Sequence, residues 1–436
     1  MPIFQARLWE EAEDAKAAAV SRRDENRVLW ADAPVHDWYR FVLSFPPHLV
    51  RQYCERFAVG PQSIVLDPFC GTGTVLVECR KLGIPSVGLE AHPMSAFASA
   101  VKVDWTPDPD GLVEHATEVA SAASKMIDAG GQVLRKLPAE SMELLLTDSI
   151  GDLALHKALI LLDCIERLYD EQYVRHERLA LARAIVKDCS NLHFGPEVGV
   201  EPSLRRRRDG PVVRAWLAGV RRMATDLRQV SGLPACSAAV LRADARCIST
   251  VLGPRCVDAV ITSPPYPNEK DYTRTTRLES VLLGFVTDKG QLRQVKRDLV
   301  RSNTRGVYKR DDDDVWIAGY PQIQRIADQI ESRRIELGKT SGFERLYHRV
   351  TKLYFGGIAR HLAELRAVLR PGARLAYVVG DQASYLRVLI RTGHLLADIG
   401  ESLGYEVLAI ELFRTRAATA TKRPVNEEVV LLRWPG

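Results

Sequence analysis

Short apolar runs alternate with turn-forming residues between positions 63 and 104. The run 63–66 ends in a loop with two glycines, and apolar residues then recur at helical spacing as far as Gly83, a C-cap residue type. A second apolar run, 85–90, ends in an acid, and another helical pattern follows over 91–103. A strand, a glycine loop, a helix, a strand and an acid in this order predict the βαβ unit of an open parallel sheet.

This alternation stops after residue 104. From about 105 to 235 the pattern predicts mainly helices, with amphipathic segments rich in alanine and leucine at 113–134 and 153–188. Strand patterns resume at 238–242 and at 257–262. The fold class predicted is therefore α/β, with one sheet that a large helical insertion interrupts.

The remainder of the chain completes the same sheet. Residues 267–342 are polar and irregular. The pattern beyond them predicts a helix over 344–369, a strand over 374–379 and a helix over 385–403. Two antiparallel strands are predicted last, at 405–413 and 427–434, with a basic loop between them at 414–423. The predicted parts are an N-terminal helical extension (1–35), the first part of the sheet domain (36–104), the insertion (105–235) and the second part of the sheet domain (236–436).

Composition describes an ordinary globular chain. Of its 436 residues, 26% are charged and 46% belong to the broad hydrophobic set. Its apolar runs fall far short of the ~20 residues that a membrane span requires, and the N-terminus lacks a signal-peptide pattern. The scattered cysteines form no CxxC pair, which favours reduced thiols. We therefore expect a cytoplasmic protein without a membrane partner.

The positive charge is small but comes mainly from arginine. The formal net charge is +5, and arginine greatly outnumbers lysine. Arginine is the better residue for bidentate contacts to phosphate and guanine. A general bias toward arginine codons explains the same numbers, so both interpretations stay open.

The glycine loop has the properties of a ligand-binding turn. Gly71 and Gly73 lack a Cβ, so a ligand can approach the backbone, and the helix that follows favours an anionic group at its N-terminus. The third glycine of the dinucleotide fingerprint is absent, because Leu76 stands in its place.

The segment that ends the later strand carries a second motif. Residues 262–266 read Thr-Ser-Pro-Pro-Tyr and follow the apolar run 257–262. Open α/β sheets place their chemistry at such carboxyl ends of strands.

Together the two motifs resemble those of a known family. The octet 67–74 resembles the cofactor loop of amino-methyltransferases, which use S-adenosylmethionine (SAM) to methylate exocyclic amines of nucleobases. Residues 263–266 resemble the catalytic (D/N/S)PPY motif of these enzymes in its serine form. The resemblance implies a class I, Rossmann-like SAM-dependent methyltransferase sheet. The glycine loop precedes the catalytic motif, which excludes the permuted members of the family.

The resemblance also implies roles for the catalytic motif, whose residues are Ser263, Pro264, Pro265 and Tyr266. The exocyclic amine is a poor nucleophile because its lone pair is delocalised into the ring, so acceptors must hold its two N–H groups. The Ser263 hydroxyl and the Pro264 carbonyl would supply these acceptors. Tyr266 would stack on the extruded base.

Cofactor-binding residues are implied in the same way. Glu90 would accept hydrogen bonds from the ribose, Asp244 would contact the adenine amino group, and Phe69 would pack beside the adenine, while core packing of the Phe69 and Phe45 rings stays an alternative. The full set implied is Phe45, Asp67, Pro68, Phe69, Gly71, Gly73, Thr74, Glu90 and Asp244.

The serine form of the motif favours cytosine N4 as the methylated atom, in a base flipped out of duplex DNA. Methylation of adenine N6, an RNA (tRNA) amino-methyltransferase and a catalytically silent SAM- or nucleic-acid-binding module are the alternatives. The expected partners are double-stranded DNA and a cognate restriction endonuclease, with nucleoid association through DNA. Residues 105–235 and 267–342 are the candidate DNA-recognition regions.

Two absences narrow the chemistry. No Pro-Cys dipeptide occurs in the sequence, so the thiolate nucleophile of a ring-carbon cytosine methyltransferase is missing. The histidines lack metal-ligand spacing, so we expect no metal. Candidate phosphate contacts lie in basic segments, namely Arg205–Arg208, Arg221, Arg222, Arg301, Arg305 and Arg310.

Overall fold

The computed structural model describes residues 30–40, 46–130, 133–195, 197–201, 209–267, 270–417 and 424–436. Most of the predicted N-terminal extension, Phe45 and the arginine run 205–208 lie outside the described residues. In the part that is described, no helix is long and apolar enough to cross a lipid bilayer.

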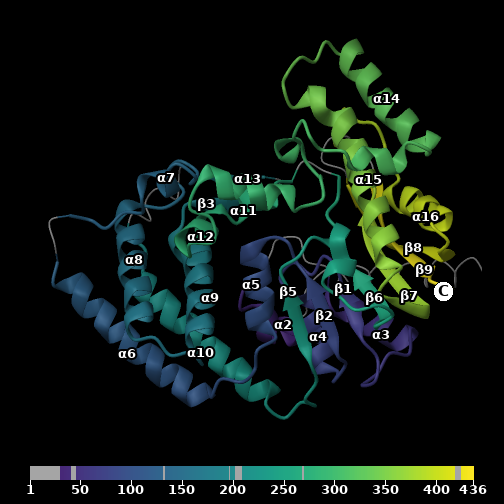
Figure 1. The fold of residues 1–436 in the computed structure, drawn as a ribbon. Helices are drawn as coiled ribbons and strands as arrows, with labels where there is room; N and C mark the ends of the chain where they lie inside the picture. The colour runs from purple at the N-terminus through teal and green to yellow at the C-terminus, as the bar shows by residue number, and fades with distance from the viewer. Residues whose placement is uncertain are drawn as a thin grey trace, which may run out of the picture.

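A seven-stranded sheet forms the centre of the sheet domain (Figure 1). Its strand order is β5-β2-β1-β6-β7-β9-β8, and β9 is antiparallel to both of its neighbours. This mixed, mostly parallel α/β sheet confirms the predicted fold class. The strands are β1 (Val65–Asp67), β2 (Ser86–Leu89), β5 (Ala238–Leu241), β6 (Val257–Thr262), β7 (Leu369–Gly380), β8 (Glu406–Ala417) and β9 (Pro424–Arg433).

The strand order reverses between β1 and β6. From β1 the chain builds outward through β2 to β5, and it then returns to place β6 on the other side of β1. The two strands pair in parallel, with Val65 opposite Ala259 and Leu66 opposite Val260. Their carboxyl ends therefore lie side by side, and a crevice at such a switch point is where open α/β sheets bind ligands.

Helices cover both faces of the sheet. Successive strand residues point to opposite faces, so Val65 is buried in one hydrophobic core and Leu66 in the other. One face packs against α3 (Pro47–Arg56), α4 (Thr74–Lys81) and α5 (Pro93–Lys102), and the other against η4 (Ala245–Thr250), α15 (Tyr347–Leu365) and α16 (Thr392–Ser402).

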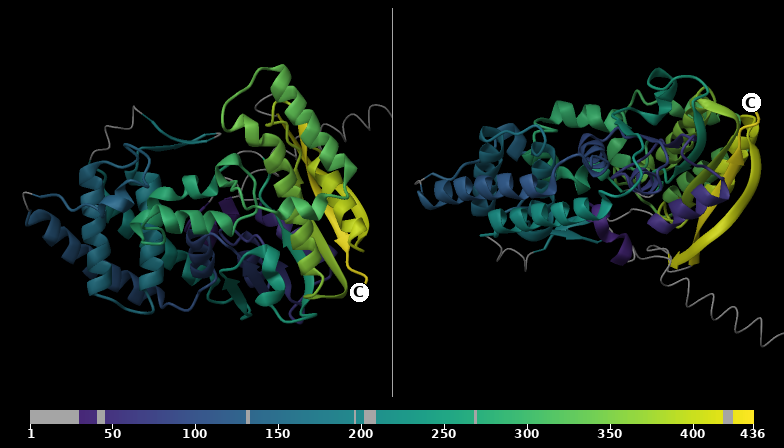
Figure 2. Two further views of the ribbon diagram at one scale, coloured as in Figure 1. Left: turned by 45° about the horizontal axis from the view of Figure 1, so that its top comes forward. Right: turned by 90° about the horizontal axis from the view of Figure 1, so that it is seen from below.

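A helical lobe stands beside the sheet (Figures 1 and 2). Its first long helix begins where the Asp108 carboxylate accepts a hydrogen bond from the Gly111 N–H at 2.6 Å, with a proline in the first turn. The lobe contains α6 (Pro109–Asp128), α7 (Ala139–Met142), α8 (Asp152–Arg167), α9 (Val174–Ala184), the π-helical turn η2 (Ile185–Cys189), α10 (Val212–Val230) and the hairpin of β3 (Leu192–Phe194) with β4 (Val198–Val200). The region predicted as an insertion is thus mainly helical, and its boundaries at 105 and 235 stay a prediction.

The prediction of an irregular stretch over 267–342 is wrong. The region contains short helices and two longer ones, whose polar faces obscured the apolar period in the sequence. The Asp288 carboxylate caps one of them by accepting from the N–H groups of Gly290 and Gln291. The helices are α11 (Tyr272–Thr275), α12 (Arg277–Leu282), α13 (Lys289–Arg297), η5 (Thr304–Gly306), η6 (Asp313–Ile317) and α14 (Pro321–Glu336).

Two further boundaries differ from the prediction. Leu386 and Arg387 have positive φ angles of 53° and 65°, so the predicted helix over 385–403 begins only at Thr392. The basic stretch after residue 413 continues β8 through Ala417, because Arg414 and Arg416 pair with Glu427 on the neighbouring strand β9.

Replacing Gly88 by alanine tests the packing of β2 under the glycine loop. A Cβ at this position would lie 2.8 Å from the Cys70 Sγ and 2.9 Å from the Leu76 Cδ1. We expect Gly88→Ala to lower the free energy of unfolding by about 1–3 kcal/mol in urea denaturation. Gly60→Ala is the matched control, because no atom lies within 4 Å of its added Cβ. Equal stability of the two variants would contradict this packing.

Candidate active site

The glycine loop joins β1 to α4 and has two different glycines. Gly71 (φ 51°) faces open space where a Cβ would stand. At Gly73 (φ 84°), a Cβ would come within 2.5 Å of the Ser99 Oγ on α5. Gly71 therefore leaves room for a ligand, whereas Gly73 allows the loop to pack closely against a helix.

A buried hydrogen bond ties this loop to the second motif. The Thr262 hydroxyl donates to the Asp67 Oδ1 at 2.6 Å, and the same oxygen accepts from the Phe69 N–H at 3.1 Å. Asp67 is 1% exposed, and burial raises its pKa to about 7. Asp67 thus joins the carboxyl ends of β1 and β6.

Glu90 follows β2 and braces the loop from the other side. Its two carboxylate oxygens accept from the N–H groups of Gly71 at 2.9 Å and of His92 at 2.7 Å. Burial raises the pKa of Glu90 to about 7. Each carboxylate oxygen has further acceptor capacity for a ligand hydroxyl.

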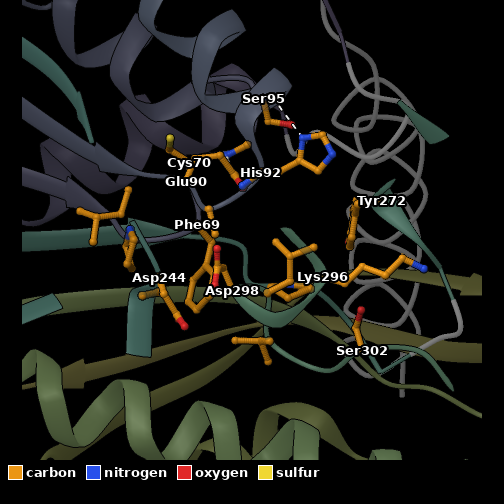
Figure 3. Close-up of a pocket in the computed structure, with 18 of the residues that line it drawn as sticks. Phe69, Cys70, Glu90, His92, Ser95, Asp244, Tyr272, Lys296, Asp298 and Ser302 are labelled. Carbon is orange, nitrogen blue, oxygen red and sulfur yellow. Dashed lines mark hydrogen bonds between the residues drawn. The ribbon is translucent and has the colours of Figure 1, made fainter. Parts of the chain in front are cut away.

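One cavity brings most of the predicted residues together (Figure 3). Those that line it come from both motifs and from the ends of β2 and β5, namely Pro68, Phe69, Gly71, Thr74, Glu90, Asp244, Ser263 and Pro265. Other predicted residues lie outside its lining, namely Asp67, Gly73, Pro264 and Tyr266. The glycine loop and the Ser-Pro-Pro-Tyr segment therefore share a single site.

Phe69 and Asp244 form one end of the cavity. The Phe69 ring meets the ring of buried His361 edge-on, with centroids 4.8 Å apart. Burial lowers the pKa of His361 to about 4, so this imidazole is neutral at pH 7. The Asp244 carboxylate accepts from the Arg246 guanidinium at 2.7 Å and from the Arg246 N–H at 2.9 Å. Both predicted side chains are thus held in place by protein contacts.

Tyr266 lies behind the serine of its own motif. Its ring packs against Gly380, where an added Cβ would come within 2.9 Å of the Tyr266 Cε2. Burial raises the pKa of its hydroxyl well above the usual value, while a hydrogen bond with the Ser263 side chain opposes this change.

Sequence reasoning missed the opposite wall of the cavity. This wall consists of α11, the end of α13 and the segment that follows it, and Figure 3 labels Tyr272, Lys296, Asp298 and Ser302 among its residues. The Lys296 ammonium pairs with the Asp271 carboxylate at 2.8 Å, and both side chains are largely buried. Charged residues in a polar stretch of sequence give no signal that they will line a cavity, so only the aromatic ring of Tyr272 was a usable hint.

Arg301 holds that wall and is unavailable to DNA. Its side chain is 5% exposed and makes two hydrogen bonds of 2.9 Å to the Asp311 carboxylate. It also donates to the carbonyls of Lys296 at 2.8 Å and of Leu299. The prediction that Arg301 neutralises a phosphate is therefore wrong, because its donors are already used within the protein.

Comparison with known proteins found similarity to DNA methyltransferases. The family model described as "DNA methylase", for N6 and N4 methyltransferases, matches residues 14–97. The Type II methyltransferase M.BsoBI of Geobacillus stearothermophilus is 25% identical over 432 residues, which cover 92% of this chain and 84% of the relative. M.AvaI of Nostoc sp. is 23% identical over 428 residues, covering 89% and 83%.

Two solved structures are also similar to this chain. TrmN from Thermus thermophilus matches with a TM-score of 0.27 and 12% identity, over 90% of this chain and 50% of its own. The rRNA methyltransferase AviRa from Streptomyces viridochromogenes matches with a TM-score of 0.30 and 15% identity, over 91% and 88%. At these scores neither likeness adds to the argument.

The mostly parallel sheet and the cavity at its switch point have the architecture of a class I-like, Rossmann-type fold. The matched family model and the Type II relatives support a DNA amino-methyltransferase of the N4/N6 family, and methyltransferases of that family use SAM as methyl donor.

The raised pKa of Asp67 predicts a pH dependence of stability. Its pKa is about 7 in the folded state against 3.8 ordinarily, so between these pH values the folded protein binds a proton that the unfolded chain releases. Stability contributed at Asp67 is therefore lost as the pH rises from about 4 to about 7. Asp67→Asn keeps the acceptor oxygen and removes the titration.

Urea denaturation at several pH values measures this effect. The free energy of unfolding of the wild type, minus that of Asp67→Asn, should fall by about 1 kcal/mol or more as the pH rises from about 4 to about 7. Two stability curves that run parallel from pH 4 to pH 7 would contradict the assignment.

Proposed function

We propose that this protein transfers a methyl group from SAM to the exocyclic N4 amine of cytosine in duplex DNA, with the target base flipped out of the helix. The observation that carries this proposal is the single cavity shared by Gly71 and Ser263. A methyl donor on the glycine loop and an amine at the serine would meet there, which supplies the proximity that methyl transfer requires.

The cofactor fits the residues of the cavity. When bound, SAM supplies an electrophilic methyl group on its sulfonium. Glu90 would accept hydrogen bonds from ribose hydroxyls, and Phe69 and Asp244 would hold the adenine. Gly71 and Thr74, at the start of α4, would receive the carboxylate at the other end of the molecule.

The catalytic motif would hold the amine. The Ser263 oxygen would accept one N–H of the amine, since a hydroxyl oxygen has two acceptor lone pairs. The Pro264 carbonyl would accept the other N–H. Holding both protons in this way orients the nitrogen lone pair toward the methyl carbon and stabilises the positive charge that develops on the amine.

Cytosine N4 is favoured over adenine N6 because the motif has serine at its first position. The relatives named as Type II methyltransferases support duplex DNA as the substrate. A cognate restriction endonuclease as partner and a cytoplasmic, nucleoid-associated location are part of the proposal. An RNA amino-methyltransferase is the second candidate, and direct competition between duplex DNA and tRNA would distinguish them. The helical lobe and the region 267–342 are the proposed DNA-contacting parts.

Mass spectrometry of digested DNA tests the base assignment. Incubation of the protein with SAM and mixed-sequence duplex DNA should yield N4-methylcytosine. Ser263→Ala should lower kcat by about 10- to 100-fold, the value of a hydrogen bond to a charged group, with little change in the Kd for SAM. Exclusive formation of N6-methyladenine would overturn the choice of base. An unchanged kcat in Ser263→Ala would overturn the role of the serine.

Two tyrosines lie close to Ser263 and the cavity, Tyr266 in the motif itself and Tyr272 in the lining. We propose Tyr266 for this role, although Tyr272 is the tyrosine that lines the cavity. Tyr266→Ala should raise the KM for DNA about tenfold, from a stacking energy of ~1–3 kcal/mol, and should exceed the effect of Tyr272→Ala. Steady-state kinetics of both variants decide the question, and a larger KM effect in Tyr272→Ala would transfer the role to that ring.

A further inference from the structure

A second hollow adjoins the cofactor cavity and has a different character. It lies between the end of α13, the loop 308–312, η4 and α15, and six cationic side chains and three carboxylates line it. Arg301 lines both hollows. Because η4 follows directly after β5 and Asp244, this hollow lies at the same edge of the sheet as the active site.

Three of its cations are neutralised inside the protein. Arg246 and Arg360 both pair with Asp313, the second at 3.4 Å. Arg301 pairs with Asp311 at 2.9 Å. These contacts build the walls of the hollow and leave its other charges unmatched.

The unmatched cations are Arg297, Lys309 and Arg310, and all three are exposed. Within the described ranges, no carboxylate lies at ion-pairing distance from any of them. Asp312 is the one remaining carboxylate of the lining, so these four side chains carry an excess of two positive charges. The surface of the hollow therefore attracts an anion.

An aromatic ring positions one of these cations. The Tyr308 ring lies 5.6 Å from the Arg297 guanidinium carbon and 5.7 Å from that of Arg301. This arrangement orients Arg297 at the rim by a cation–π contact. Both guanidinium groups contact the Tyr308 ring, which is therefore not free to stack on a nucleobase.

A set of partly exposed hydrogen bonds fixes the loop that carries Lys309 and Arg310. The Arg349 Nη2 lies within hydrogen-bonding distance of the carbonyls of Tyr308 at 3.0 Å, Lys309 at 3.2 Å and Asp311 at 3.3 Å. The Tyr308 N–H donates back to the Asp311 carboxylate at 2.7 Å. Lys309 and Arg310 thus project from a preorganised backbone, which reduces the entropy lost when they bind a ligand.

We propose that this hollow binds a backbone phosphate of the substrate DNA through Arg297, Lys309 and Arg310. Arginine and lysine are the ordinary donors to phosphate, and a phosphodiester needs no stacking surface. The hollow adjoins the cavity proposed to hold SAM and the target base, so it is suitably placed for a phosphate near the flipped nucleotide. This inference rests on the proposed function, since it takes DNA to be the substrate.

Salt-dependent binding of a fluorescein-labelled, mixed-sequence duplex tests the proposal. The double variant Lys309→Ala/Arg310→Ala should bind about tenfold more weakly at 0.1 M salt. The slope of log K against log salt should become shallower by about one, the value for one lost phosphate contact. The Kd for SAM should be unchanged.

Arg255→Ala is the control for loss of a positive charge outside the hollow. Arg255 is exposed and precedes β6, at the edge of the sheet opposite the active site. The Arg255→Ala variant loses one positive charge far from the hollow. Its affinity for DNA and its salt slope should therefore equal those of the wild type. A thermal melt of each variant verifies folding.

Three outcomes would contradict the proposal or the function on which it rests. A double variant with the affinity and slope of the wild type overturns it, provided that the wild type methylates DNA. If DNA binding is unchanged but inorganic phosphate raises the Tm of the wild type alone, the hollow binds a free anion, and the assignment to DNA is wrong. A wild type that methylates no DNA refutes the proposed function itself.

Discussion

The site depends on one buried hydrogen bond between the ends of two neighbouring strands. Thr262 ends β6 and donates to Asp67, which ends β1. The strands are neighbours only because the chain reverses its direction of travel across the sheet between them. The bond therefore places two loops that are almost 200 positions apart in the sequence at a shared cavity.

Burial of charge is the second constraint on the cavity. Asp67 and Glu90 both have a pKa raised to about 7 by desolvation, and each holds a backbone N–H of the glycine loop. Across the cavity, the pairs Lys296–Asp271 and Arg301–Asp311 fix the opposite wall. Each side is thus rigid because it buries polar groups with partners, which is a form of preorganisation.

The sequence was sufficient to predict the half of the site that has strong local patterns. The strand 257–262 is buried along most of its length, so its apolar run identified it with the correct bounds. The loops after β1 and β6 carry rare residue combinations that mark them directly. Phe69, Glu90, Asp244 and Ser263 consequently appear on one cavity as expected.

The other half could not be predicted, for a physical reason. Residues 267–342 are polar, and sequence patterns assign charged side chains to solvent. Here Lys296 and Arg301 are buried because carboxylates from Asp271 and Asp311 neutralise them, and such pairing depends on tertiary contacts. The motif likewise did not reveal that the Tyr266 ring lies against Gly380 and outside the cavity lining.

A crystal structure of the protein with S-adenosylhomocysteine and a duplex containing its target site would test the central claim most directly. The account predicts the ribose against Glu90, the sulfur near Gly71 and the exocyclic amine of an extruded base within hydrogen-bonding distance of Ser263, all in one cavity. A cofactor product bound elsewhere, or a target base held away from Ser263, would contradict it.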